Sequence, residues 1–238
     1  MTTDTPAIPT VKAPPDRLYG RIKSHSLRPR QRLMLDETLP RLRFLLSQAN
    51  DPRAAFPQPV DELWLEVGFG AGEHAFAQIT AHPHVGLIAC EVFEIGLCGL
   101  LSKLVEEGAE ATGPLPGNLR IHDDDARQLL RALPDGSLHK LILNFPDPWP
   151  KLRHAKRRFV HPALLPEVAR ALVPGGEWRI ATDDPTYQAW TEEILAAQSL
   201  FRVPEPATTR PEGWPPTRYE AKAIKAGRQP LYWSAIRV

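Results

Sequence analysis

Five short apolar runs alternate with segments of helical length between residues 62 and 198, and this alternation most constrains the fold. The apolar runs cover residues 62–69, 85–92, 119–123, 138–145 and 176–183. The segments that follow them cover residues 72–81, 94–108, 125–133, 161–172 and 185–198. Continuous apolar runs are typical of strands buried on both faces. The alternation therefore predicts an α/β fold with a parallel sheet and helices on both faces, and residues 231–238 predict a last strand.

The length and composition fit one globular domain. The chain has 238 residues, 42% of them hydrophobic, which is enough to bury a sizeable core. We expect residues 1–20 to form a disordered tail and residues 21–238 to form the domain. The sequence has neither a membrane-spanning apolar run nor an export signal pattern. Its two cysteines, Cys90 and Cys98, form no CxxC motif, so we expect a cytoplasmic protein without a membrane or metal partner.

Charge is unevenly distributed along the chain. Residues 61–135 hold thirteen acidic side chains against four basic ones, although the whole chain has a net charge of only +1. The basic residues gather in residues 17–32, 151–158 and 218–228. If the fold brings these clusters onto one face, that face suits a polyanion. The alternative for the first and last clusters is an ordinary solvated surface.

The first apolar run ends in a glycine-rich turn, EVGFGAGE, that spans residues 66–73. Gly68, Gly70 and Gly72 permit a tight turn and a close approach of the backbone to a ligand. Glu73 stands where a dinucleotide fingerprint has its last glycine, and a carboxylate there would repel a pyrophosphate. Carboxylates around the glycines instead suit a cofactor with a cationic end, such as S-adenosylmethionine. The alternative is a purely structural turn.

The next two runs also end in acidic residues. Glu91 is placed to accept hydrogen bonds from both hydroxyls of a ribose, a contact found in NAD and S-adenosylmethionine folds alike. The third run ends in HDDDA, where a carboxylate would lie near an adenine amino group. We choose Asp125 for that contact, with Asp124 as a close rival, and we expect one of the three aspartates to be only a helix cap.

The fourth run ends in NFPDPWPKLRHAKRRFV, residues 144–160. Pro146 and Pro148 restrict the backbone on both sides of Asp147, and Trp149 follows. Such a rigid polar and aromatic loop suits the positioning of a nucleobase, and positioning supplies much of the rate in a displacement reaction. The basic run behind it, residues 151–158, suits a polyanion.

Taken together, four stretches of the sequence resemble a known family. NFPDPWPKLRHAKRRFV, LEVGFGAGE, ATDDPTYQAW and TRYEAKAIKAG are similar to the bacterial tRNA (guanine-N7-)-methyltransferases of the TrmB type, from about residue 21 to the C-terminus. The resemblance implies a Rossmann-like class I S-adenosylmethionine-dependent methyltransferase fold with a mostly parallel seven-stranded sheet. It also implies methylation of N7 of guanine 46 in the variable loop of tRNA, with tRNA as the partner.

The resemblance also implies roles for individual residues. The cofactor would be bound by Glu66, Gly68, Gly70, Glu91, Asp125 and Asp147. The substrate would be contacted by Lys151, Asp183, Thr217, Arg218, Tyr219 and Glu220, with Lys151 at the phosphate of the target nucleotide. The flanking RNA backbone would be contacted by Arg153, His154, Lys156, Arg157 and Arg158. The triple aspartate at 123–125 and Asn144, which stands where a second aromatic often occurs, depart from the family pattern.

The chemistry predicts which groups the reaction needs. Guanine N7 has a free lone pair, so it can attack a sulfonium methyl by in-line displacement without a general base. The site must instead hold the base and tolerate the positive charge that develops on it. We assign Asp147 and Asp183 to this role, with Asp183 reading the base and Glu220 as a further candidate.

Three rival functions remain at this stage. They are an NAD-dependent oxidoreductase, an RNA-binding protein without catalysis, and a methyltransferase of an exocyclic base amine. The broken glycine fingerprint counts against the first, and the acidic residues at four strand ends count against the second. The aspartate between the two prolines counts against the third. The sequence leaves open whether the protein is a monomer or a homodimer.

Overall fold

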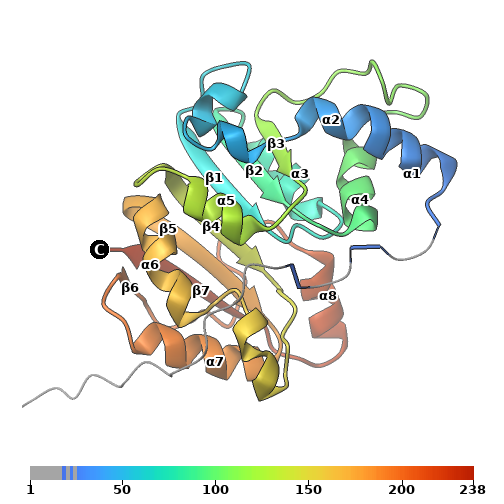
Figure 1. Cartoon of the computed structure of the whole chain (residues 1–238). Coiled ribbons are helices and arrows are strands. Elements are labelled where there is room, and N and C mark those ends of the chain that lie inside the picture. The colour runs from blue at the N-terminus through green and yellow to red at the C-terminus, as the bar shows by residue number, and fades with distance from the viewer. Residues whose placement is uncertain (1–17, 20–21, 24–25) are drawn as a thin grey trace, which may run out of the picture.

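A computed structural model describes residues 18–19, 22–23 and 26–238. The predicted tail therefore lies outside the described residues except for Leu18 and Tyr19. The described chain folds around one sheet, with its strands in the order β3-β2-β1-β4-β5-β7-β6 (Figure 1). The strands are β1 (Glu62–Val67), β2 (Val85–Cys90), β3 (Leu119–His122), β4 (Leu138–Asn144), β5 (Leu172–Thr182), β6 (Phe201–Arg202) and β7 (Leu231–Arg237).

The sheet is mostly parallel and seven-stranded, as predicted. The strands β1 to β5 pair in parallel, whereas β7 runs antiparallel to both β5 and β6. The two-residue β6 was not predicted, because two residues carry no periodicity to recognise. The carboxyl ends of the five parallel strands meet at one edge of the sheet, where ligands of such sheets bind.

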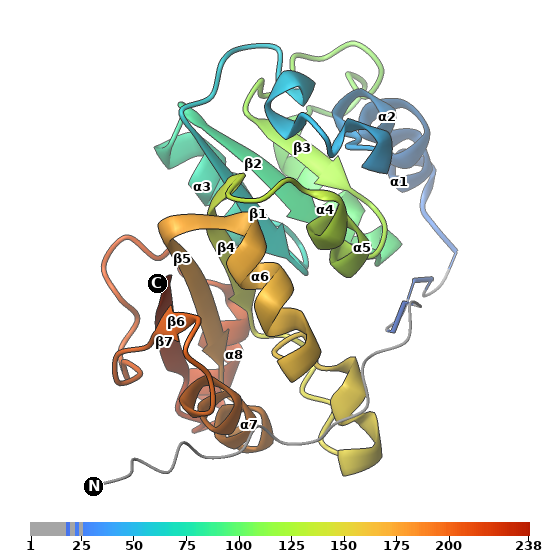
Figure 2. The same ribbon diagram turned by 60° about the vertical axis from the view of Figure 1, so that its left-hand side comes forward.

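Helices cover both faces of the sheet (Figures 1 and 2). Apolar side chains of α5 (Ala126–Ala132), α6 (Leu165–Ala171) and α7 (Pro185–Ala196) form one core with alternate residues of the strands, such as Leu65 and Trp178. On the other face, α3 (Glu73–Ala81) and α4 (Glu94–Leu104) pack against Trp64 and Ile142. Because both faces are covered, the central strands read as continuous apolar runs.

Two helical regions were not predicted from the sequence. The first comprises α1 (Pro29–Leu33), a π-helical turn (Met34–Thr38) and α2 (Leu39–Leu42), and it packs into the same core as α3 and α4. The second is α8 (Arg218–Lys225). Its first turn is closed by a capping box, in which Thr217 Oγ1 accepts from the Glu220 N–H at 3.0 Å. This box orders α8 beside the ligand edge.

The helix predicted over residues 94–108 ends earlier, at Leu104, and the boundary between α6 and β5 also needs correction. We expected a helix to residue 172 and a strand from 176, but α6 ends at Ala171 and β5 begins directly at Leu172. The PGG sequence therefore lies inside the strand and does not separate two elements. The pairing with β4 is irregular there, because the register shifts between Leu138 and Lys140 and Gly175 has a φ of 77°.

Candidate active site

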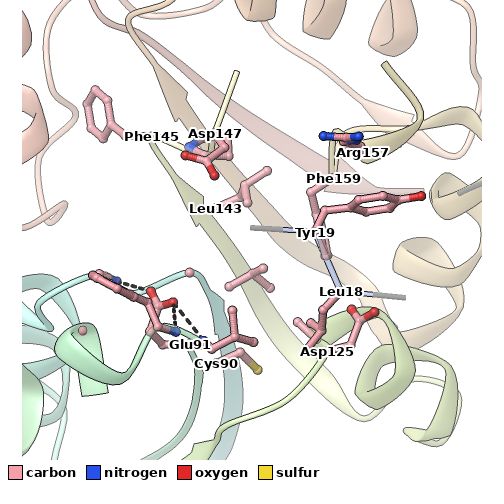
Figure 3. A pocket seen from close by; sticks show the side chains of 18 of the residues that line it. Leu18, Tyr19, Cys90, Glu91, Asp125, Leu143, Phe145, Asp147, Arg157 and Phe159 are labelled. Carbon is pink, nitrogen blue, oxygen red and sulfur yellow. Dashed lines mark hydrogen bonds between the residues drawn. The ribbon is translucent and has the colours of Figure 1, made fainter. Parts of the chain in front are cut away.

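One cavity of about 410 Å³ opens at the carboxyl ends of β1, β2 and β4 (Figure 3). Its walls come from the glycine turn, the end of β2, the start of α5, the start of α8 and the loop that follows β4, residues 145–150, which we call the proline loop. The polar and charged side chains that line it are Tyr19, Glu91, Asp124, Asp125, Arg127, Asp147, Arg157, Arg218 and Tyr219. The structure thus brings together acidic residues from three predicted strand ends.

Two of the three glycines of the glycine turn are closely packed, whereas a Cβ at Gly68 would meet no atom within 4 Å. Gly72 has a φ of 76°, and a Cβ there would lie 2.5 Å from the Cβ of Leu100 on α4. Gly70 has a φ of 60°, and a Cβ there would lie 3.1 Å from the ring of Tyr219. The turn is therefore packed between α4 and α8, and its backbone forms the cavity wall.

Glu91 braces the glycine turn against the end of β2. Its Oε2 accepts from the Gly70 N–H at 2.8 Å, and its Oε1 accepts from the N–H groups of Val92 and Phe93 at 2.8 and 3.0 Å. Burial raises the pKa of this carboxyl, while the three backbone donors oppose the rise. Oε2 has one donor and keeps acceptor capacity on the cavity side.

Glu66 lies behind the cavity wall and is not among the lining residues. It is 1% exposed, and its Oε1 lies 3.1 Å from Nδ1 of His74, which is 3% exposed. Gln78 contacts the other ring nitrogen of His74 at 3.2 Å. The second oxygen of Glu66, Oε2, is buried without a hydrogen-bond partner among the described residues. His74 and Gln78 were not predicted, because a histidine inside a helix gives no separate sequence signal.

The three consecutive aspartates have different environments. Asp123 forms a two-point ion pair with Arg43, with contacts of 3.0 and 2.9 Å, and does not line the cavity. Asp124 is exposed and lines the cavity. Asp125, our choice for the adenine contact, lines the cavity and is also the cap of α5, the role that we expected for one of the three aspartates.

Asp125 is held by a partner that the sequence did not reveal. Arg127 donates through Nη2 to Oδ2 at 2.7 Å and through Nε to Oδ1 at 3.0 Å. Burial works against the carboxylate, but the hydrogen bonds and charge of Arg127 outweigh it and lower the pKa of Asp125. Arg127 therefore keeps the side chain of Asp125 ionised and fixed in position.

The proline loop is bent by two residues with left-handed backbone. Phe145 and Trp149 have φ values of 48° and 44°, and they bracket Pro146, Asp147 and Pro148. This conformation costs about 1–2 kcal/mol for a residue with a side chain. The bend brings Asp147 to the cavity (Figure 3). Phe145 is anchored through its N–H to the Ala181 carbonyl oxygen at 2.7 Å.

Tyr19 forms part of the cavity wall, which the sequence did not predict. It lines the cavity, and the guanidinium groups of Arg127 and Arg157 lie 5.4 and 5.0 Å from its ring centroid. Arg157 also lies 4.6 Å from the ring centroid of Trp149. Arg157 is therefore part of the cavity, although we predicted it only as an RNA contact.

The predicted substrate residues divide into two groups. Arg218 and Tyr219 line the cavity, whereas Lys151, Asp183, Thr217 and Glu220 do not. Asp183 lies at the end of β5 and pairs with Nε of Arg228 at 2.5 Å. Glu220 is 7% exposed and accepts from the Tyr232 hydroxyl at 2.7 Å and from Arg210 Nε at 3.1 Å. Its carboxylate is therefore occupied in holding the first turn of α8.

The basic segment has an outer and an inner side. Lys151 and Arg153 are exposed, and Lys156 and His154 are half-buried. Arg158 is only 4% exposed and donates to the carbonyl oxygens of Pro148 and Trp149 at 3.1 and 3.0 Å. The structure thus places Arg158 beneath the loop, whereas we predicted it at the RNA surface.

Two features are absent from the described part of the chain. No helix in it is both long enough and apolar enough to cross a membrane. It contains no cluster of three or more His, Cys, Asp and Glu side chains arranged to hold a metal ion.

Solved structures share the fold at low sequence identity. A 16S rRNA methyltransferase KamB superposes with a TM-score of 0.53 at 17% identity, over 75% of this chain and 88% of that one. A 16S rRNA (adenine(1408)-N(1))-methyltransferase from Catenulisporales acidiphilia reaches 0.54 at 15% identity, over 82% and 94%. These likenesses support the class I methyltransferase fold.

Sequence comparisons are more specific. A family model described as putative methyltransferase matches residues 61–232. The tRNA (guanine-N(7)-)-methyltransferase of Granulibacter bethesdensis is 62% identical over 229 residues, covering 96% of this chain and 98% of that protein. The enzyme of the same name from Rhodospirillum rubrum is 48% identical, covering 91% and 86%. The chain therefore belongs to the bacterial tRNA (guanine-N7-)-methyltransferase family.

Proposed function

We propose that the protein transfers a methyl group from S-adenosylmethionine to N7 of a guanine in tRNA, at position 46 of the variable loop. The observation that carries this proposal is the single cavity in which Glu91 and Asp125 from the first half of the sheet meet Asp147 from the proline loop. The names of the relatives support tRNA as the substrate and N7 of guanine as the atom that is methylated.

The residues of the cavity fit the methyl donor. Glu91 has remaining acceptor capacity for a ribose hydroxyl, because Oε2 receives only the Gly70 N–H. Asp124 is exposed, and Asp125 keeps some acceptor capacity for an adenine amino group despite its pair with Arg127. Glu66, which we also predicted as a cofactor ligand, lies behind the glycine turn and outside the cavity, with its Oε2 buried and without a partner among the described residues. When bound, S-adenosylmethionine supplies a methyl group on a positively charged sulfur.

The target base would lie between the proline loop and the end of β5. Asp183 is the better candidate to accept hydrogen bonds from the guanine N1–H and amino groups. Its side chain is 17% exposed and has one close cation, whereas Glu220 is buried and its carboxylate accepts from Tyr232, Arg210 and the Thr217 backbone. Outside the cavity, the exposed Lys151 and Arg153 would hold the RNA backbone.

The displacement needs no proton transfer. The N7 lone pair forms the new bond to the methyl carbon while the carbon–sulfur bond breaks and its electron pair returns to sulfur. The positive charge moves from sulfur to the guanine, so the carboxylates of Asp147 and Asp183 would stabilise the charge that develops. Positioning the nitrogen, the methyl carbon and the sulfur in line is then the main contribution of the chain.

Methyl transfer to a tRNA transcript tests the proposal. We expect labelled S-adenosylmethionine to label the transcript, and labelling to disappear when the variable-loop guanine is replaced by adenine. Labelling that persists in the variant would refute the position, and a label that is not N7-methylguanine would refute the reaction. A thermal-shift comparison separates the cofactors, because S-adenosylhomocysteine, and not NAD, should stabilise the protein.

A further inference from the structure

We propose that Arg158 is a positioning residue of the methyl-transfer site, which fixes the proline loop from below and does not bind RNA. This inference deepens the proposed function and rests on it for the role of the loop. Arg158 belongs to a run of cations whose other members face outward or line the cavity. Arg158, in contrast, is buried, with only 4% of its surface exposed.

The proline loop has few backbone N–H groups with which to form internal hydrogen bonds. Residues 146, 148 and 150 are prolines, so three of its backbone positions have no N–H to donate. Phe145 and Trp149 hold the left-handed conformation at its two ends. Conformations of this kind persist where the surrounding structure over-determines them.

The two ends of the loop have different anchors. At the first end, the N–H of Phe145 donates to Ala181 on β5, and its ring packs beside Trp214 and Tyr232. At the second end, the guanidinium of Arg158 donates to two successive carbonyl oxygens, those of Pro148 and Trp149. A planar fork of donors suits this two-point contact, which a lysine ammonium cannot reproduce with the same geometry.

Arg158 is itself held by α7. Its guanidinium lies 4.8 Å from the ring centroid of Trp190, whose Nε1 donates to the Val160 carbonyl oxygen at 2.6 Å. The N–H of Val160 donates to the buried hydroxyl of Tyr187 at 3.1 Å. Burial lowers the pKa of Arg158, and the nearby Tyr187 and Asp184 oppose the fall, so the group remains a cation at neutral pH.

The same helix begins beside the proposed base reader. Asp184 caps α7 by accepting from the Tyr187 N–H at 3.0 Å, and Asp183 is its immediate neighbour in the chain. Through Tyr187, Trp190 and Arg158, α7 therefore sets the position of the proline loop relative to Asp183. This linkage fixes the separation of Asp147 and Asp183, the two carboxylates assigned to the guanine.

The test compares Arg158→Lys with Arg170→Lys. Arg170 is a matched control, because it also donates to backbone carbonyl oxygens, those of Leu130, Arg131 and Leu133, but far from the cavity. We expect Arg158→Lys to lower kcat about 10- to 100-fold, with KM for tRNA within about twofold of the wild type. Arg170→Lys should lower Tm and leave kcat unchanged. Arg158→Ala extends the series if it folds.

Two results would overturn the proposal. One is an Arg158→Lys enzyme that loses stability but keeps kcat, as the control does. The other is an Arg158→Ala enzyme with a raised KM together with a log–log salt slope reduced by roughly 0.7–0.9, which is the signature of a lost phosphate contact. The exposed Arg153→Ala provides a reference for that signature.

A readout without turnover keeps this inference separate from the proposed function. The chain has six tryptophans, so the 19F resonance of Trp149 in fluorotryptophan-labelled protein is assigned with Trp149→Phe. We expect that resonance to shift or broaden in Arg158→Lys and to stay in place in Arg170→Lys and Arg153→Ala. An unchanged Trp149 resonance in Arg158→Lys would refute the proposal that Arg158 fixes the proline loop, even if the wild type methylates another substrate.

Discussion

The two halves of the ligand edge are built differently. Around β1, β2 and α5, the carboxylates of Glu91 and Asp125 already have partners from their own chain, and Gly72 in the glycine turn is packed too tightly for a methyl group. Around β4, β5 and α8, several side chains are open to solvent. Leu152 is 81% exposed and Tyr219 is 40% exposed, and Arg228, the partner of Asp183, has a half-exposed side chain.

This difference matches the two ligands proposed for the site. A small cofactor is bound best by a concave and preformed site, because little ordering is then needed on binding. An RNA is held mainly through its phosphates, by cations that remain accessible. The proline loop lies at the boundary, since Asp147 faces the cavity and the exposed cations follow it. Variants on either side should therefore separate cofactor binding from RNA recognition.

The largest expected effect comes from Asp183→Ala. Loss of a two-point contact to a base costs about 1–3 kcal/mol, so we expect turnover to fall by up to about 100-fold. The affinity for S-adenosylhomocysteine should not change, because Asp183 lies outside the cavity. Arg228→Gln, which removes only the partner of Asp183, should have a smaller effect in the same direction. Intact turnover in Asp183→Ala would remove this residue from base recognition.

A smaller effect is expected from Glu91→Gln, on the other side of the boundary. The amide keeps one acceptor but loses the charge that strengthens three backbone hydrogen bonds. A loss of about 1–2 kcal/mol, or roughly 5- to 30-fold in the dissociation constant of S-adenosylhomocysteine, should follow. Calorimetry should find tRNA affinity unchanged. Glu94→Gln, three residues along and outside the cavity, is the control.

The same variant tests the effect of burial on Glu91. Burial raises the pKa of this carboxyl, so it gains its proton at a higher pH than an exposed glutamate. Cofactor binding uses the carboxylate, so wild-type affinity should fall as the pH is lowered through that raised range. Glu91→Gln should lack this fall. An identical pH dependence in both proteins would assign it to another group.

Much of the fold could be predicted because it depends on apolar periodicity. The five parallel strands and the helices between them were read from the sequence, since strands buried on both faces leave continuous apolar runs. The start of β5 was missed because a PGG sequence normally ends a helix or strand. Here it lies within β5, and the pairing of β5 with β4 is irregular at that point. The capping-box sequence Thr217 to Glu220 could have predicted α8, but we took those residues only as substrate contacts.

The site was less predictable, because its details depend on contacts between distant segments. Arg43 with Asp123, Arg228 with Asp183, and Tyr19 beside Arg157 join residues far apart in the sequence, and no local pattern marks them. Arg158 is the clearest case. Its neighbours suggest a uniform basic surface, whereas Arg158 follows the helical turn Leu152–Arg157 in extended backbone and lies inward beneath Trp149.

The smallest expected effect comes from Lys151→Ala, at the open side of the boundary. Lys151 is exposed and follows the proline loop directly, so its contribution to RNA binding should be that of a single solvated contact. We expect tRNA affinity to fall by about 0.5–1 kcal/mol, roughly two- to fivefold at moderate salt. The log–log slope of affinity against salt should decrease by roughly 0.7–0.9, because one phosphate is no longer neutralised. Lys151→Arg should restore the slope, and S-adenosylhomocysteine binding should be the same in all three proteins. A lower cofactor affinity in Lys151→Ala would show that the two halves of the edge are not independent, because the proline loop would then transmit the loss from the RNA side to the cavity.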